Sequence, residues 1–354
     1  MHPESDGDPQ GRSGGPPPGA SASAVVVLSA GTSSLGGRVQ ARVAGDPAVR
    51  SVRLLDDDEP YGPQFDGASV WVHLAFDDNT EIDPTCTART NVEGMRRRLE
   101  AAAAAGVRQI VVLSSATVYG AWPNNPVPLT EEAPLRPNPE FSYAVQHATI
   151  ERIVADWADD HPDATVAVVR PAVGLAEGHD SWIARSLAAA AGIRAGEDDP
   201  PVQFVHLDDL AAAIDCVRRS GESGVFNVAP DGWIPGDAVR ALAGDKPRLE
   251  LPARLAAQLA EWSWELRLGP IPPGLVPYTQ SPWVVANDRL RAIGWVPKFT
   301  NEEAFVEGTE GTWWSMMSPK RKQELALGVS GVTLLMGAAG VGWLVRRAKR
   351  AARV

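Results

Sequence analysis

Short, unbroken runs of apolar residues recur along the first two thirds of the chain, and stretches with helical character lie between most of them. Such runs are typical of parallel strands that are buried on both faces of a sheet. Strands are predicted, in chain order, at 24–28, 52–55, 69–75, 109–113 and 165–170. Because strands that alternate with helices build βαβ units, the pattern predicts a doubly wound parallel sheet, an α/β fold.

The helices of this part are marked by composition and by glycine. An Ala-rich helix is predicted over about Asn91–Ala105, and Gly106 suits the position that ends a helix. Another helix is predicted around Tyr143–Trp157. The polar pair Ser114-Ser115 follows the strand at 109–113, at the edge where open parallel sheets bind ligands.

The alternation loosens beyond about Ala176. Returning strands are predicted at 203–205 and 224–228, and the helix between them is predicted to begin with Asp208 as its N-cap. After Val228 the chain becomes rich in proline and tryptophan. This change of pattern indicates a second, smaller domain.

The predicted organisation is therefore a doubly wound α/β domain at 24–228 and a small domain at 229–318. Residues 1–23 are rich in Gly, Pro and Ser and are predicted to form a disordered leader. The leader lacks the basic start and apolar core of a signal peptide.

The C-terminal region has a different character. Residues 325–345 contain no charged side chain, and a helix of this length spans about 31 Å, the thickness of a bilayer core. Basic residues flank the segment, at 320–322 and in the tail at 346–354. We expect a single-pass transmembrane helix in the cell membrane with the main body in the cytoplasm, because no signal peptide directs its export. A buried terminal helix is the alternative.

Charge separates the body from the tail. The chain of 354 residues has a net charge of −11, yet residues 320–354 hold eight Lys and Arg against Glu324 alone. The body is therefore strongly acidic, which argues against nucleic acid as a partner. Two cysteines, Cys86 and Cys216, supply neither a disulfide framework nor the spacing of metal ligands. No metal site is expected.

Two motifs carry a family resemblance. SSATVYG at 114–120 and NPEFSYAVQH at 138–147 resemble the extended short-chain dehydrogenase/reductases of the NAD-dependent epimerase/dehydratase type. Segments HLA at 73–75, RPAV at 170–173 and FVHLDD at 204–209 follow in the family's order. The resemblance covers about residues 24–300 and implies a Rossmann domain that binds NAD or NADP, with NAD favoured, followed by a substrate-binding domain. It also implies that the strand ends near Ala75, Pro171 and Val173 line the nicotinamide site.

The loop after the first strand is the candidate phosphate site. Backbone N–H groups and the helix dipole bind pyrophosphate at such a strand–turn–helix. The family pattern is TGxxGxxG, whereas this chain has Ala30 and Ser33 at two of the three glycine positions. The candidate cofactor-binding residues are Gly31, Ser33, Ser34 and Leu35. The Cβ of Ser33 is expected to crowd a pyrophosphate and so to weaken binding.

A carboxylate after the second strand would bind the adenosine ribose and select NAD. Asp56 is the candidate. Only 37 residues separate Gly36 from His73, so by the resemblance one βα unit is missing or shortened. Asp56 then ends either the second or the third strand of the family's sheet. A solvated acidic turn, DDDEP, is an equal alternative.

The resemblance assigns the catalytic roles. Ser115 polarises the substrate oxygen and Tyr143 is the general acid/base. The family lowers the tyrosine pKa with a lysine four residues later, which also binds the nicotinamide ribose, but this chain has His147 there. Histidine is largely neutral at pH 7, so it would donate a hydrogen bond to the ribose and lower the tyrosine pKa less.

Two functions remain open. The leading one is NAD(P)-dependent epimerase, dehydratase or dehydrogenase chemistry at a hydroxyl or ketone of a sugar-nucleotide or lipid-linked small molecule, catalysed at the membrane. The other is a catalytically degenerate, membrane-tethered protein that binds a dinucleotide or acts as a scaffold. A homodimer is compatible with either.

Overall fold

The computed structural model describes residues 24–29, 33–176, 182–190, 193–195, 199–236, 238, 249–251, 253–266 and 271–309. Its centre is a parallel six-stranded sheet with the strand order β2-β1-β3-β4-β5-β9. The strands are β1 (Ala24–Ser29), β2 (Val49–Leu54), β3 (Val70–His73), β4 (Gln109–Leu113), β5 (Thr165–Pro171) and β9 (Gly224–Val228). The predicted doubly wound α/β fold is confirmed.

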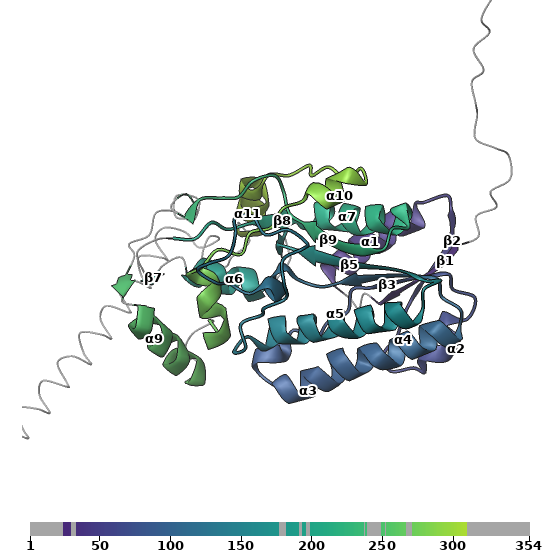
Figure 1. The fold of residues 1–354 in the computed structure, drawn as a ribbon, viewed down its shortest axis with the longest axis horizontal. Helices are drawn as coiled ribbons and strands as arrows, with labels where there is room; N and C mark the ends of the chain where they lie inside the picture. The colour runs from purple at the N-terminus through teal and green to yellow at the C-terminus, as the bar shows by residue number, and fades with distance from the viewer. Residues whose placement is uncertain are drawn as a thin grey trace, which may run out of the picture.

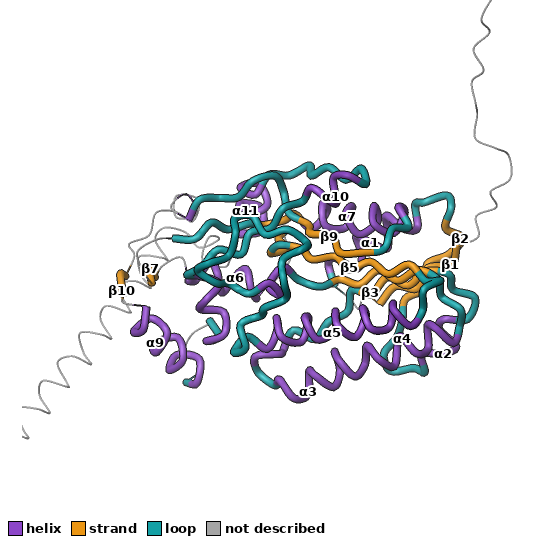
Figure 2. The backbone as a smooth tube through the Cα atoms, viewed as in Figure 1, coloured by secondary structure: helices purple, strands orange, loops and turns teal. Residues whose placement is uncertain are grey.

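Helices cover both faces of this sheet (Figures 1 and 2). One face carries α1 (Ser34–Ala44), α7 (Leu207–Ser220) and α10 (Asp288–Ala292). The other carries α2 (Tyr61–Phe65), α3 (Pro84–Ala88), α4 (Gly94–Ala104) and α5 (Ser142–Asp160). A π-helical turn at Arg89–Glu93 joins α3 to α4.

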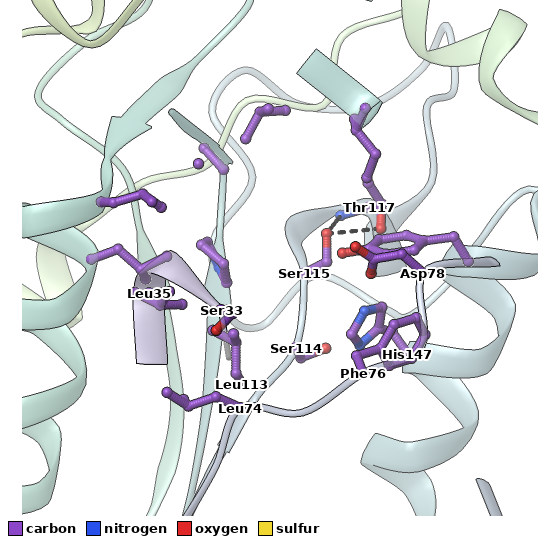
Figure 3. Close-up of a pocket in the computed structure, with 18 of the residues that line it drawn as sticks. Ser33, Leu35, Leu74, Phe76, Asp78, Leu113, Ser114, Ser115, Thr117 and His147 are labelled. Atoms are coloured by element: carbon purple, nitrogen blue, oxygen red, sulfur yellow. Dashed lines mark hydrogen bonds between the residues drawn. The ribbon is translucent and has the colours of Figure 1, made fainter. Parts of the chain in front are cut away.

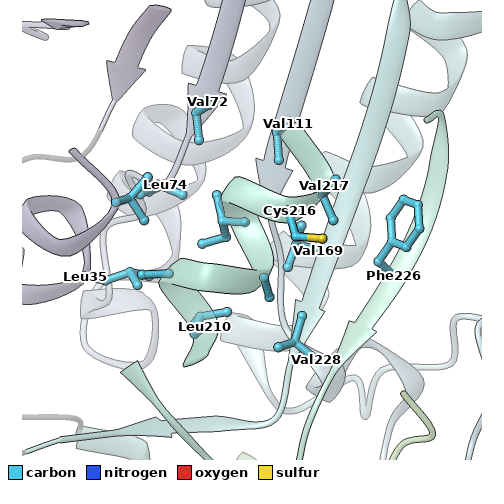
Figure 4. Close-up of a cluster of buried hydrophobic side chains, with 14 of the residues drawn as sticks. Leu35, Val72, Leu74, Val111, Val169, Leu210, Cys216, Val217, Phe226 and Val228 are labelled. Atoms are coloured by element: carbon cyan, nitrogen blue, oxygen red, sulfur yellow. The ribbon is translucent and has the colours of Figure 1, made fainter. Parts of the chain in front are cut away.

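Alternate residues of the strands supply two cores. Val26 and Leu28 of β1 pack toward α1 and α7. Figure 4 shows other members of this cluster, among them Val72, Val111 and Leu210. Val25 and Val27 pack on the opposite face, against α4 and α5. All four side chains are at most 1% exposed, so the apolar run at the start of the chain is a strand buried on both faces, as its sequence predicts.

The strand order reverses beside β1. The chain passes from β1 to β2 on one side and then crosses to β3 on the other, which leaves a switch point between β1 and β3. Ligands bind at the carboxyl ends of strands at such a point. Within the described residues β2 is the edge of the sheet, so Asp56 follows the strand adjacent to β1.

A second group of elements lies beyond the strand ends. It includes two parallel strand pairs: β6 (Val173–Leu175) with β8 (Phe204–His206), and β7 (Ile193–Ala195) with β10 (Leu249–Leu251). Its helices are α6 (Trp182–Ala190), α9 (Ala253–Glu265) and α11 (Asn301–Thr309), with 3₁₀ turns at Asn79–Glu81, Ala116–Tyr119 and Pro273–Thr279 bordering it. Residues between β5 and α7 thus pack with residues that follow β9.

One detail of the prediction is wrong. His206, not Asp208, is the N-cap of α7: its side chain accepts a hydrogen bond from the Asp208 backbone N–H. Asp208 instead bonds with Arg38 at 2.8 Å and joins α7 to α1. It lies in the first turn of α7, where an acidic residue also suits the start of a helix.

The leader at 1–23 and the apolar segment at 325–345 lie outside the described residues. Within the part of the chain that the structure does describe, no helix has the length and apolar character needed to cross a membrane.

Candidate functional site

A cavity of about 420 Å³ opens at the carboxyl ends of the central strands. Ends of β3, β4 and β5 form its floor, the start of α1 forms one side, and α5 and α6 form the other. Figure 3 shows Ser33 and Leu35 across the cavity from Asp78, Ser115 and Thr117. The cavity therefore lies at the switch point of the sheet, where the fold predicts a ligand.

The start of α1 keeps part of the predicted phosphate site. Ser33 and Leu35 line the cavity, while Gly31 lies outside the described residues. Ser33 is the N-cap of α1, and its Oγ accepts a hydrogen bond from the Gly36 N–H at 3.0 Å. Its φ of −71° is ordinary for any residue, so no glycine is required by the backbone here. Ser34 Oγ accepts a hydrogen bond from Arg38.

Asp56 is not among the residues that line the cavity. It is exposed, and its carboxylate accepts a hydrogen bond from the Asp58 N–H at 3.0 Å in the turn after β2. The neighbouring Asp57 forms an ion pair with the buried Arg98. The acidic turn thus has structural roles, and the ribose role of Asp56 stays a prediction.

The strand-end residues predicted for the nicotinamide site meet in the cavity. Ala75 follows β3, while Pro171 and Val173 lie at the end of β5 and in β6, and all three line the cavity. A buried ion pair between Arg170 and Glu151 fixes the end of β5. Arg170 also donates to Tyr119 Oη at 2.7 Å, and Ser114 donates to Glu151, so this edge of the sheet is held by a connected polar network.

Ser115 is positioned by the end of β4. It is the N-cap of the 3₁₀ turn at Ala116–Tyr119, where its Oγ accepts hydrogen bonds from the Thr117 N–H at 3.2 Å and the Thr117 hydroxyl at 2.9 Å. Ser115 is 7% exposed and lines the cavity. Because the Thr117 hydroxyl is the donor in this bond, the Ser115 hydroxyl proton can form a hydrogen bond with a ligand in the cavity.

Tyr143 projects from the first turn of α5 into the same cavity. Burial and the nearby carboxyl of Asp78 raise the pKa of Tyr143 above its usual value, and its hydrogen bond with Ser115 lowers it only in part. Among the described residues, no cationic side chain lowers the tyrosine pKa. The Tyr143 hydroxyl is therefore protonated near neutral pH.

His147 lies one turn further along α5, with 3% of its surface exposed. Its ring stacks on Phe76 with centroids 3.9 Å apart and meets the Tyr143 ring edge-on at 4.6 Å. Neither ring nitrogen has a hydrogen-bond partner among the described residues, and burial lowers the pKa of His147 to about 3. The histidine that stands where the resemblance expects lysine is neutral throughout the physiological range.

Sequence reasoning did not name several of the cavity residues, among them Phe76, Asp78, Thr117 and Trp182. Asp78 matters most, because it is the one formally charged side chain among the described lining residues. Burial, and next the charge of Asp77, raise the pKa of Asp78 to about 6. The aspartate pair at 77–78 closely follows the HLA strand end, but the sequence does not show which of the two faces the cavity.

The comparisons with known proteins agree with this geometry. A reductase of Streptomyces sp., the 3-diazoavenalumate denitrifying reductase, is 33% identical over 228 residues, 60% of this chain and 68% of the relative. RMD from Pseudomonas aeruginosa, solved with NADPH, has a TM-score of 0.58 at 20% identity, and the match covers 80% of this chain and 98% of that one. The dTDP-glucose 4,6-dehydratase of Bacillus anthracis, solved with NAD, has a TM-score of 0.59 at 16% identity over 83% of this chain and 97% of that one.

Within the described residues, no group of His, Cys, Asp and Glu side chains is arranged to hold a metal ion. The sequence model of the NAD dependent epimerase/dehydratase family matches residues 24–229, more than half of the chain. With the sheet order, the SSATVYG turn and the tyrosine of α5 in place, this protein belongs to the NAD dependent epimerase/dehydratase family.

Proposed function

We propose that the protein is an NAD(P)-dependent oxidoreductase of the epimerase, dehydratase or dehydrogenase type, acting on a hydroxyl or ketone. The observation that carries this proposal is the meeting of Ser115 and Tyr143 in one cavity with the start of α1 and the strand ends of the switch point. A hydroxyl donor, a tyrosine acid and a helix N-terminus converge there.

The residues present fit a dinucleotide. The N-terminus of α1 faces the cavity through Ser33 and offers backbone N–H groups to a pyrophosphate. The two ring nitrogens of His147 are buried without a partner among the described residues, as expected of a group that a ribose hydroxyl would satisfy. When bound, the dinucleotide supplies or accepts the hydride, and side chains of the protein transfer the proton.

The proton chemistry falls to Tyr143 and Ser115. In the direction of carbonyl reduction, Tyr143 donates its proton to the substrate oxygen while Ser115 donates a hydrogen bond to the same oxygen. Both side chains line the same cavity. The Arg170–Glu151 pair beneath keeps the strand ends in place.

For the substrate we propose a sugar-nucleotide or a lipid-linked small molecule. Support for the first comes from the structural likeness to the dTDP-glucose dehydratase. Support for the second comes from the uncharged stretch at 325–345 with its basic flanks. Aromatic side chains of Phe76, Tyr143 and Trp182 in the lining favour a substrate with an apolar face.

We also propose that residues 325–345 tether the protein to the cell membrane, with the main body on the cytoplasmic side. Full-length protein is then expected to stay in the membrane fraction through high-salt and carbonate washes, whereas a chain that ends at Ser318 is recovered in the supernatant. Release of the full-length protein by salt alone would show that the basic flanks, not the apolar stretch, hold it there.

The oxidoreductase proposal is tested by titrating the chain with NADH and NADPH, and by comparing turnover of wild type and Tyr143→Phe over a panel of sugar-nucleotides and ketones. We expect dinucleotide binding, and turnover that the variant loses. Activity that survives Tyr143→Phe would remove this site from the mechanism. Binding without turnover on any substrate would support the alternative, a non-catalytic dinucleotide-binding protein.

A further inference from the structure

The charge balance of the cavity differs from the one that the resemblance implies. His147 stands at the position of the expected lysine and carries no charge, so the positive charge is missing. Asp78 adds a carboxylate to the same cavity. Among the described lining residues the net formal charge is therefore negative, and it is located beside the tyrosine that handles the proton.

Asp78 is held in place by a specific set of contacts. Asn91 accepts a hydrogen bond from the Asp77 N–H at 2.8 Å and donates to the Asp77 carbonyl at 3.1 Å. The same Asn91 amide donates to Gln146 of α5 at 2.9 Å. Glu81 accepts a hydrogen bond from the Tyr143 N–H at 2.9 Å. The segment that carries Asp78 is thus bonded on both sides to the helix that carries Tyr143 and His147.

Among the described residues, no charged partner compensates the carboxylate of Asp78. No ion pair or side-chain hydrogen bond to Asp78 occurs within the part of the chain that the structure describes, whereas the neighbouring Asp77 carboxylate accepts a hydrogen bond from the Asn79 N–H. A carboxylate in a cavity without a protein partner stabilises a positive charge on whatever binds there.

We propose that Asp78 makes this cavity favour the oxidised over the reduced dinucleotide, so that the bound pair acts mainly as a reductant of substrate carbonyls. This inference rests on the proposed oxidoreductase function. The nicotinamide ring is a cation when oxidised and neutral when reduced, so a nearby carboxylate stabilises only the oxidised form. Stabilising the oxidised form makes its reduced partner a stronger hydride donor.

The state of Tyr143 points in the same direction. Carbonyl reduction needs an acid, because the carbonyl carbon gains a hydride from the reduced dinucleotide and the oxygen gains a proton, which gives an alcohol and the oxidised dinucleotide. Tyr143 is protonated near neutral pH and serves as that acid, and solvent returns its proton after turnover. Alcohol oxidation needs the tyrosinate, which Asp78 and burial both disfavour. Ketone reduction is therefore the favoured reaction.

The experiment measures the dissociation constants of the oxidised and the reduced dinucleotide for the full-length protein at pH 8, by calorimetry and by fluorescence. Asp78→Asn removes the charge and keeps the size of the side chain. We expect the ratio of the reduced-form to the oxidised-form constant to fall about fivefold in the variant, a value that allows for solvent screening of a cavity charge. The loss should come from weaker binding of the oxidised form.

Two further variants make the test specific. Asp163→Asn removes the same charge from an exposed loop, where Asp163 contacts only Arg108 at 3.8 Å among described partners, and should leave the ratio unchanged. Asp78→Ser repeats the test with a smaller side chain, which covers the case in which the asparagine amide of the first variant disturbs the fold around position 78. A ratio that changes less than twofold in both Asp78 variants would overturn the inference and leave the proposed function intact. Failure of wild type to bind either form at millimolar concentration would overturn both.

Discussion

Replacing Asp78 should stabilise the protein, and the gain should depend on pH. Burial and the charge of Asp77 raise the pKa of Asp78 from 3.8 to about 6. The folded state therefore holds a proton on Asp78 at pH values where the unfolded chain has lost it. Ionising the carboxyl costs folding free energy as the pH rises from about 4 to above 6, and the cost is fully present above the folded pKa.

The magnitude follows from the two pKa values. A tenfold difference in proton affinity between the folded and unfolded states corresponds to about 1.4 kcal/mol, so without screening the cost would grow by ~2 kcal/mol between pH 4.5 and pH 8. The Asp78 side chain is open to solvent through the cavity, and water screens its charge. About half of that difference, ~1 kcal/mol, is the expected value.

The assay is urea unfolding of wild type and Asp78→Asn at pH 4.5 and pH 8. The variant should gain ~1 kcal/mol more stability at the higher pH than at the lower one. The exposed Asp163→Asn control, with its weak 3.8 Å contact to Arg108, should change stability equally at both pH values. An Asp78 variant whose effect is the same at both pH values, or larger at pH 4.5, would refute the reasoning.

Three other perturbations test the surroundings of the cavity. His147→Phe should make the protein less sensitive to acid. The pKa of His147 is lowered to about 3 in the fold, so below pH 6.5 only the unfolded wild-type chain binds a proton there. In urea unfolding, the free energy of unfolding of the variant relative to wild type should be about 2 kcal/mol higher at pH 5 than at pH 8. Arg170→Met should cost about 3 to 5 kcal/mol in thermal or urea unfolding by leaving Glu151 buried without its partner, whereas a double variant with Glu151→Leu should recover most of the loss; a double variant as unstable as the single one would contradict this. Ser33→Gly should cost only a few tenths of a kcal/mol in stability and should tighten dinucleotide binding in calorimetry, because it frees the Gly36 N–H for a phosphate; unchanged affinity would show that this N–H does not bind the phosphate.

The sheet could be predicted from the sequence because its signals are local. Except for the edge strand β2, the β-strands of the central sheet contain short apolar runs, and a run such as Val25–Leu28 is buried between two layers of helices. The N-cap of α7 was missed for an equally local reason. Histidine is an unusual cap, and Asp208 is the residue type that the position usually prefers.

The roles of Ser115, Tyr143 and His147 depended on a motif, and the structure places all three in one cavity as that motif implies. The motif does not specify which residues surround each of these side chains. The neutrality of His147 follows from its burial, and one of the rings that pack on it belongs to Phe76, a residue 71 positions away in the chain. The sequence shows that lysine is absent, but the packing decides what the replacement can do.

Asp78 shows why the charge of a site is the hardest property to predict. In the sequence it is one of two consecutive aspartates, and nothing distinguishes it from Asp77. In the fold, Asn91 bonds with the Asp77 backbone and the Asn79 N–H donates to the Asp77 carboxylate, while Asp78 lines the cavity. One charge is thereby lost at position 147 and one of the opposite sign is added at position 78, through contacts that join three segments of the chain. The reaction direction that we propose follows from that sum, and it depends on distances in space that the spacing of residues in the sequence does not encode.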